Sequence, residues 1–260
     1  MMRLPLAAAM AACVLSFLFV AVMTVAGPVR AAEAEPPPKT ALILSVSWQP
    51  GFCATRTTRT ECRAATPESF ESTHFTLHGL WPMRQSYCGI DAAVKSGDKA
   101  GKWTDLAQLT LDAATTKALD ARMPGRRSGL DRHQWVRSGS CTGLSPDAYF
   151  TLQDEFLERL NASPVLALFR DRGGKTVTAK EVRTAFDQGF GPGSGERVRI
   201  TCRKAGDRQV VTGLTIGLGA LPSTSNPTPL ANLIQTAAAT PEKCAEAIVE
   251  AGGPAVQTLR

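Results

Sequence analysis

Short apolar runs bounded by polar and turn residues predict the strands of this chain. Residues 40–48 (TALILSVSW) carry a continuous apolar run rich in β-branched side chains, and residues 74–80 (HFTLHGL) form a second candidate. Residues 197–202 and 209–218 predict two further strands, and alternating polarity supports the first of these.

Apolar residues at helical spacing predict the helices between these strands. Residues 104–121 have leucines at that spacing, and a helix from Gly129 to about Cys141 follows. Another opens at Ser145-Pro146-Asp147 and ends at Asn161. Thr178-x-x-Glu181 is a capping box for a short helix ending near Gly189. The Gly191–Gly195 stretch and the segment between Cys53 and Cys62 read as loops.

The N-terminus has the pattern of an export signal. Arg3 precedes an apolar run over residues 4–26, and Ala32-Glu33-Ala34 has the form of a signal peptidase site. We therefore predict a cleaved signal peptide over residues 1–34 and a secreted or periplasmic protein. The run is also long enough to span a bilayer, so an uncleaved anchor is the alternative. Residues 35–260 contain no repeat or clear linker and are expected to form one α+β domain.

Composition narrows the class of protein. Hydrophobic residues make up 43% and charged residues 20%, which excludes a disordered or fibrous chain. Lys+Arg 29 against Asp+Glu 23 gives +6, a basic excess that permits a nucleic-acid partner without requiring one. Of the seven cysteines Cys13 falls in the signal, and an even six remain, which predict disulfides with about fifteen possible connectivities. These are Cys53, Cys62, Cys88, Cys141, Cys202 and Cys244.

Two clusters of polar side chains could carry chemistry, and both contain histidine. In the segment from Arg132 to Cys141, helical spacing places His133 beside Arg137, and Gln134 beside Ser138, as in an anion site. A solvated helix face near a disulfide is the alternative. In FTLHGLWP, His78 lies at a strand end close to Trp81, although a lone histidine there is more often structural. His74 is the one remaining histidine.

Taken together, the two clusters resemble a known family. FTLHGLWP and HQWVRSGSC resemble the two active-site segments of the ribonuclease T2 family, the second of which is usually His-Glu-Trp-x-Lys-His-Gly-Thr-Cys. The segment from Trp48 to Cys53 is similar to the family as well. The resemblance implies a central antiparallel sheet packed with helices. It also implies three disulfides, Cys53–Cys62, Cys88–Cys141 and Cys202–Cys244.

The resemblance further implies an endoribonuclease that cleaves single-stranded RNA through a 2′,3′-cyclic phosphate without metal or cofactor. His78 corresponds to the catalytic histidine of the first segment, and His133 to a histidine that holds the phosphate. Gln134, Arg137 and Ser138 stand where the family usually has Glu, Lys and the second catalytic His. Serine does not exchange protons usefully near neutral pH, so we expect His133 to take the proton role. A T2-fold RNA-binding protein with weak or no catalysis is the alternative.

Several residues are candidates for binding RNA outside this core. Trp81 is supported by its motif as a surface for base stacking. His74 would point to the same side of a regular strand as His78 but roughly 13 Å away. Arg126 and Arg127 precede the second segment and could steer phosphates, or could be ordinary loop charges. We expect a monomer that acts on RNA rather than DNA and has no membrane contact once the signal is cleaved.

Other reaction classes fit the sequence poorly. There is no Gly-x-Ser-x-Gly elbow for a serine hydrolase. No C-x-x-C pair and no His/Asp/Glu cluster with ligand spacing supports a zinc or other metal site.

Overall fold

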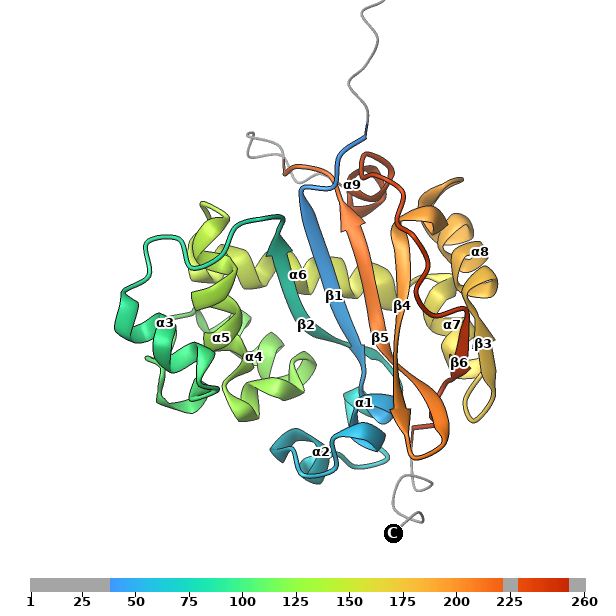
Figure 1. Cartoon of the computed structure of the whole chain (residues 1–260), viewed down its shortest axis with the longest axis horizontal. Coiled ribbons are helices and arrows are strands. Elements are labelled where there is room, and N and C mark those ends of the chain that lie inside the picture. Colours follow the sequence, from blue (N-terminus) through green and yellow to red (C-terminus); the bar gives the residue numbers. More distant parts are fainter. Residues whose placement is uncertain (1–37, 222–228, 253–260) are drawn as a thin grey trace, which may run out of the picture. The chain divides into compact units, whose positions relative to one another are not determined.

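The structure is a computed structural model that describes residues 38–221 and 229–252 (Figure 1). It is an α+β fold in which helices pack on and beside a twisted sheet, as the sequence predicts. The predicted signal peptide, residues 1–34, lies outside the described residues.

The strands form one sheet in which β1 and β5 are central. The strands are β1 (Leu42–Trp48), β2 (Phe75–Pro82), β3 (Thr176–Thr178), β4 (Val198–Ala205), β5 (Arg208–Leu218) and β6 (Glu246–Ile248). β1 pairs with β2 and β5, β4 pairs with β5, and β3 pairs with β6, all antiparallel. β6 pairs with β5 in parallel, so the sheet is mixed rather than purely antiparallel.

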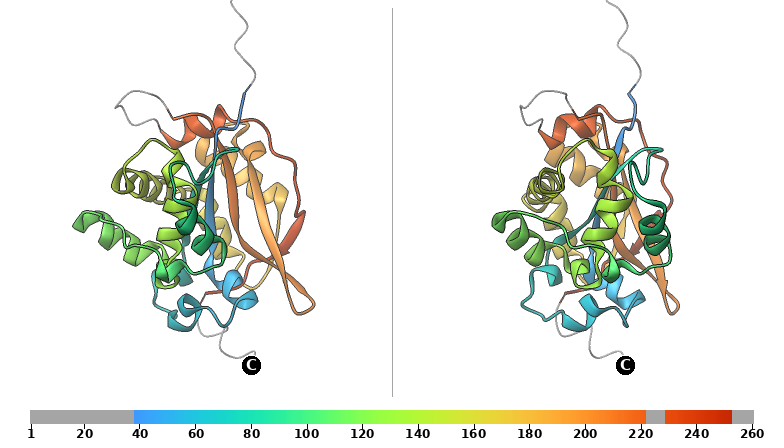
Figure 2. Two further views of the ribbon diagram at one scale, coloured as in Figure 1. Left: turned by 60° about the vertical axis from the view of Figure 1, so that its left-hand side comes forward. Right: turned by 90° about the vertical axis from the view of Figure 1, so that its left-hand side faces the viewer.

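Helices fill the connections between the strands. The α-helices are α1 (Gln49–Thr55), α2 (Thr60–Ala64), α3 (Ala92–Lys99), α4 (Ala113–Arg122), α5 (Leu130–Arg137), α6 (Pro146–Asn161), α7 (Pro164–Asp171), α8 (Ala179–Phe190) and α9 (Leu230–Gln235). The 3₁₀ helices are η1 (Phe70–Ser72), η2 (Trp103–Asp105), η3 (Pro124–Ser128), η4 (Gly139–Cys141) and η5 (Ser194–Arg197). Helices α3, α4 and α5 lie to one side of the sheet, next to β2 (Figure 2).

The hydrophobic core lies between the sheet and helices α6, α7 and α8; in Figure 1, α6 runs behind the strands, and α7 and α8 lie toward the right-hand side. Trp48, Phe75 and Phe169 meet there edge to face, with ring centroids 4.6–5.5 Å apart. This is the preferred geometry for aromatic pairs. The core therefore fixes the ends of β1 and β2 close to the histidine segment.

Strand β2 lies at the edge of the sheet, and helix α6 occupies its free backbone groups. The Asn161 side chain accepts from the Phe75 N–H and donates to the Phe75 carbonyl, both at 3.0 Å. The Tyr149 hydroxyl donates to the Leu80 carbonyl at 2.8 Å. An edge strand held in this way is rigid and protected from pairing with another chain.

Two predicted elements are corrected by the structure. The helix predicted over 104–121 begins only at Ala113, where the Asp112 carboxylate accepts from the Thr115 N–H as an N-cap. The leucines before it, such as Leu106 and Leu109, pack against the core from non-helical chain. The segment between Cys53 and Cys62 is a loop only over residues 56–59, because α1 ends at Thr55 and α2 begins at Thr60.

The three disulfides join the pairs that the family resemblance implies. They are Cys53–Cys62, Cys88–Cys141 and Cys202–Cys244. Cys53–Cys62 joins α1 to α2, and Cys88–Cys141 joins the chain after β2 to η4. Both bridges therefore fasten segments that border the histidines.

Replacing Cys88 and Cys141 by serine is expected to destabilise the fold by about 4 kcal/mol, because this bridge closes a long loop. The two cysteines are separated by 53 residues. Urea unfolding of the double variant measures the change, and the m-value is expected to rise because the unfolded chain without the bridge is less compact. Equal stability of the variant and the wild type would show that the bridge adds nothing to the fold.

Candidate active site

His78 is presented by an irregularity in β2. Ser45 pairs with Gly79 and Val46 with Leu77, so His78 is the extra residue of a β-bulge. A bulge changes the direction in which a side chain points, because it interrupts the alternation of side chains along the strand. Bulges are frequent near active sites. The Ser47 hydroxyl lies 3.4 Å from His78 Nδ1. The bulge therefore turns the imidazole toward a cavity and leaves Nε2 without a hydrogen bond to any of the described residues.

Gly79, the residue after His78, allows the second active-site segment, residues 133–141, to pack directly against β2. A Cβ at this position would stand 2.1 Å from Gln134 Oε1 and 2.7 Å from Trp81 Nε1. In the space that glycine leaves, Trp81 Nε1 donates to Gln134 Oε1 at 2.8 Å. Gln134 is 1% exposed. The predicted catalytic residue Gln134 therefore joins the two segments through Trp81.

His133 lies on α5 and is oriented by a buried carboxylate. Its Nδ1 is 2.7 Å from Asp98 Oδ1, and the Tyr87 hydroxyl donates to Asp98 Oδ2 at 2.7 Å. The His133 ring stacks on Trp103 at 4.1 Å between centroids. A carboxylate at Nδ1 fixes the tautomer and leaves Nε2 as the reactive nitrogen.

Both histidines are held neutral near pH 7. Burial, together with the nearby charge of His133, lowers the pKa of His78 to about 4. Burial also lowers the pKa of His133, against the opposing effect of Asp98, and the Arg137 charge acts in the same direction as burial. His133 therefore influences His78 although the two residues come from different segments.

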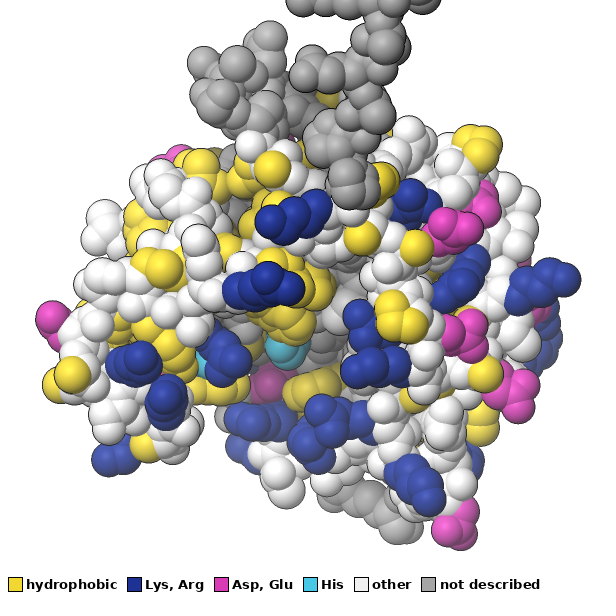
Figure 3. All heavy atoms as spheres, turned by 45° about the horizontal axis from the view of Figure 1, so that its top comes forward, with side chains coloured by type: hydrophobic (Ala, Val, Ile, Leu, Met, Phe, Trp, Pro, Cys, Tyr) yellow, Lys and Arg dark blue, Asp and Glu magenta, His cyan; other side chains and the backbone are white. Residues whose placement is uncertain are grey.

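A cavity of about 100 Å³ adjoins His78. It is lined by Ser47, Gln49, Phe52, Arg59, Glu61, Leu77, His78, Trp103, Gly125, Ser128 and Leu130. In Figure 3 this face is hollowed beside the histidine side chains, and Lys and Arg side chains gather on both sides of the hollow. A cavity with basic surroundings and the His78 imidazole at its wall suits an anionic ligand.

The two remaining predicted catalytic residues occupy different environments. Arg137 is exposed, and its charge lowers the pKa of His133, which places it beside the site. Ser138 is 3% exposed and follows α5 as its C-cap. It does not line the cavity at His78. The serine therefore stands where α5 ends and offers no group to the cavity.

The predicted RNA-binding residues are only partly gathered at this site. Trp81 lies edge-on to His78, with ring centroids 5.8 Å apart. His74 precedes β2, stacks on Phe70 and accepts from Arg170 at Nε2, at a distance of 2.7 Å. It is not among the residues that line the His78 cavity.

Arg126 and Arg127 belong to η3 and line a different cavity, of about 400 Å³. Both are paired with carboxylates. Arg126 contacts Asp120 and Asp131, and Arg127 lies 3.2 Å from Glu71. The structure therefore does not bring these arginines to the His78 cavity.

Three residues of the site have no signal in the sequence motifs. Asp98 orients His133, Trp103 stacks on it, and Glu61 lines the cavity. Each comes from a segment outside both motifs, and only tertiary folding brings it to the histidines.

Within 38–221 and 229–252, no group of three or more His, Cys, Asp or Glu side chains is placed to hold a metal ion. Over the same ranges, no helix has the length and apolar character needed to cross a membrane.

Comparison with known proteins agrees with this geometry. The profile of the Ribonuclease T2 family matches residues 39–227. Ribonuclease I of Escherichia coli (strain K12) is 29% identical over an alignment of 184 residues that covers 62% of this chain and 69% of that protein. Intracellular ribonuclease LX of Solanum lycopersicum is 26% identical over 158 residues, 55% of this chain and 59% of that protein.

Solved structures show the same fold. The self-incompatibility-associated SF11-RNase of Nicotiana alata superposes with a TM-score of 0.53 at 18% identity, over 82% of this chain and 99% of that one. A mutant of RNase MC1 in complex with 5′-UMP gives a TM-score of 0.50 at 14% identity, over 82% and 100% of the two chains. The profile of the ribonuclease T2 family matches residues 39–227, which is most of this chain. The chain therefore belongs to the ribonuclease T2 family and is a ribonuclease.

Proposed function

We propose that this protein is an endoribonuclease that cleaves single-stranded RNA by transphosphorylation, without a metal ion, and releases 2′,3′-cyclic phosphate ends. The observation that carries this proposal is that His78 lines a cavity whose wall includes Trp103, the ring on which His133 stacks. His78 comes from the bulge in β2, and His133 comes from α5 with Asp98 behind it. General acid–base catalysis of this reaction needs two such groups.

His78 is the general base in this scheme. With a pKa of about 4 it is neutral above that pH, so its free Nε2 can accept a proton. The 2′-O–H bond breaks and its proton moves to His78 while the 2′-oxygen bonds to phosphorus. A weak base suits this role because the imidazole is unprotonated throughout the mildly acidic range.

His133 is the general acid. The phosphorus–5′-oxygen bond breaks, and the leaving oxygen takes a proton from His133 Nε2. Asp98 accepts a hydrogen bond from Nδ1 and stabilises the protonated ring, which opposes the effect of burial on its pKa. The Arg137 guanidinium supplies positive charge for the phosphorane oxygens, and its planar fork is well matched to phosphate.

This assignment gives a bell-shaped pH dependence of kcat/KM with an acidic optimum. The acid limb is expected near pH 4, where His78 becomes protonated and can no longer act as a base. The basic limb is expected below pH 6.5, because the pKa of His133 is lowered from that value. Initial rates on a fluorescent oligoribonucleotide across pH 3–8 measure both limbs. A maximum above pH 7 would contradict these roles.

The proposed substrate follows from the size of the cavity. It holds roughly one ring system and is partly closed by Phe52 and Trp103, so a base must leave its stack to enter. Single strands allow this and duplexes resist it. We therefore expect the purified protein in EDTA to degrade single-stranded RNA and to leave double-stranded RNA and DNA intact. Loss of activity in EDTA that returns with added metal would overturn the metal-independent mechanism.

A catalytically silent RNA-binding protein is the second candidate, and one observation favours it. Ser138 stands in place of the second catalytic histidine and is buried at the end of α5. Such a protein would bind RNA at the cavity without forming cyclic phosphate. Turnover separates the two functions directly.

We also propose that the protein is exported and acts as a monomer. The apolar segment and the small-residue site at 32–34 support cleavage, and the three disulfides suit an oxidising compartment. N-terminal sequencing of protein recovered from a secreting host tests the cleavage, and sedimentation tests the oligomeric state.

A further inference from the structure

The cavity beside His78 contains a buried carboxylate that the proposed chemistry does not use. Glu61 lines this cavity together with His78, and it is 5% exposed. A buried carboxylate ordinarily pairs with a cation or accepts several hydrogen bonds. Among the described residues, the one hydrogen bond to this side chain comes from the Ser128 hydroxyl, which donates to Oε2. Glu61 therefore retains acceptor capacity.

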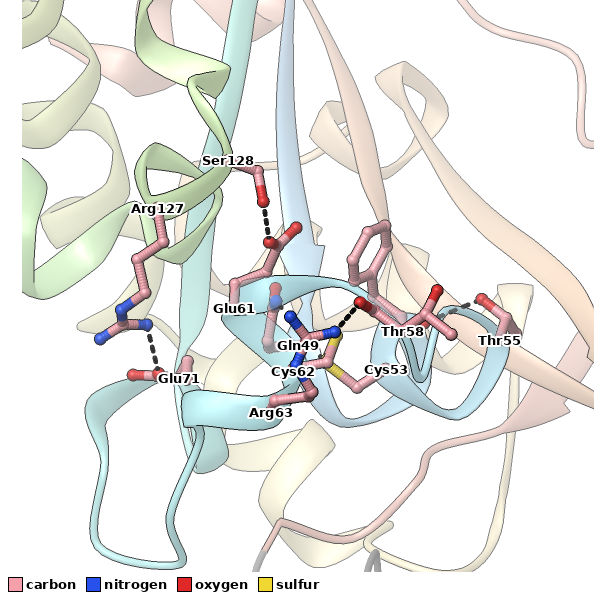
Figure 4. Close-up of a disulfide and its surroundings, with 11 residues drawn as sticks. Gln49, Cys53, Thr55, Thr58, Glu61, Cys62, Arg63, Glu71, Arg127 and Ser128 are labelled. Carbon is pink, nitrogen blue, oxygen red and sulfur yellow. Dashed lines mark hydrogen bonds and ion pairs between the residues drawn. A yellow bond between two sulfur atoms is a disulfide. The ribbon is translucent and has the colours of Figure 1, made fainter. Parts of the chain in front are cut away.

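The position of Glu61 is fixed by its surroundings (Figure 4). It lies in α2 next to Cys62, which is bonded to Cys53 of α1. Ser128, at the end of η3, holds one carboxylate oxygen from the opposite side. In Figure 4 the Glu61 side chain points from α2 toward Ser128. A short helix tied by a disulfide gives the carboxylate a defined direction, as a recognition group requires.

The rest of the cavity wall combines polar residues, among them Gln49 and Arg59, with apolar ones. Phe52, Leu77 and Leu130 contribute hydrocarbon surface, and Trp103 adds an aromatic ring. Apolar walls with a few convergent polar groups are typical of a pocket for a flat ligand. When a ring fills this space it displaces water from Glu61. The carboxylate then needs donors from the ligand, or it is left unsatisfied at a large cost.

We propose that Glu61 selects guanine, by accepting hydrogen bonds from the N1–H and N2–H groups on its Watson–Crick edge. This inference rests on the proposed ribonuclease function and specifies the base that the site prefers. Guanine presents two adjacent donors that match the two oxygens of a carboxylate, and ionised acceptors form the stronger class of hydrogen bond. Each oxygen can accept more than one bond, so the bond from Ser128 is compatible with this pairing.

The other bases meet this carboxylate less well. Adenine and cytosine each place a ring nitrogen that accepts beside their amino group, and that nitrogen faces a carboxylate oxygen with like polarity. Uracil offers one N–H between two carbonyl groups. Each of these bases therefore offers the carboxylate at most one donor, where guanine offers two, and adenine and cytosine add a repulsive contact. We expect guanine to be favoured by about 10- to 100-fold in kcat/KM.

The test is cleavage of dinucleoside monophosphates with each base in turn on either side of the phosphate. The wild type is expected to prefer guanine on one side. Glu61→Gln is expected to remove this preference, because its amide NH₂ faces a guanine donor, while rates on the other bases change little. Glu71→Gln is the matched control, since Glu71 is an equally buried carboxylate that pairs with Arg127 and does not line this cavity.

Binding of mononucleotides separates this inference from the proposed function. Titration calorimetry with 5′-GMP, 5′-AMP, 5′-CMP and 5′-UMP needs no turnover. Tighter binding of 5′-GMP that Glu61→Gln abolishes would support guanine selection even if no RNA were cleaved. Cleavage and binding that are indifferent to the base, or a guanine preference that survives in Glu61→Gln, would overturn the role of Glu61 and leave the ribonuclease function intact.

Discussion

Replacing His78 by alanine is expected to lower kcat on single-stranded RNA by about 10²–10⁴-fold, the range typical of a lost general acid or base. His78 is the group in the cavity that is neutral and has a free ring nitrogen in the mildly acidic range. Ser47, its neighbour at 3.4 Å, cannot replace it as a base. Because the imidazole contacts the reacting hydroxyl in this scheme, kcat should fall more than KM rises.

His74→Ala is the matched control for this variant. His74 lies four residues earlier, outside the cavity, with its ring on Phe70. Its replacement is expected to leave kcat unchanged. Steady-state kinetics on both variants, with circular dichroism to confirm folding, decide the result. If His78→Ala kept wild-type kcat, the base would have to be another group.

Replacing His133 by alanine is expected to have the second largest effect, again a loss of about 10²–10⁴-fold in kcat. With Ser138 buried at the end of α5, His133 is the imidazole of the second segment that remains to donate a proton. The remaining slow reaction is expected to lose the basic limb of the pH profile, because the group that titrates there is absent.

Asp98→Asn distinguishes a proton donor at His133 from a mere phosphate contact. An asparagine amide keeps the shape of the pair but removes the negative charge that raises the pKa of His133. The basic limb should therefore move to lower pH, and kcat at pH 6 should fall. If the limb stayed in place in Asp98→Asn, and His133→Ala remained active, His133 would not be the acid.

The sequence predicted the elements whose boundaries are set by local chemistry. Ser145-Pro146 starts α6 and the Thr178 capping box starts α8, because caps act within one turn. The helix predicted over 104–121 was wrong before Ala113, because tertiary contacts rather than local chemistry decide the structure there. The spacing of Leu106 and Leu109 is helical, but these side chains are buried by tertiary contacts from extended chain.

The candidate site was predictable only as far as the two motifs extend. The motifs predicted His78 and His133, because each carries its own local setting of strand or helix. Asp98, Glu61 and Trp103 reach the site from separate segments, and no spacing along the chain relates them to a histidine. The roles proposed for Arg126 and Arg127 rested on charge alone, and in the structure carboxylates pair with both.

The most direct test of the proposed mechanism is analysis of the product ends after digestion of single-stranded RNA in EDTA at pH 5. The wild-type protein is expected to form 2′,3′-cyclic phosphate ends, and His78→Ala of equal folded content should form almost none. This result would show that the site works although serine replaces the usual second histidine. Absence of cyclic ends from folded wild-type protein, or equal amounts from His78→Ala, would contradict the mechanism.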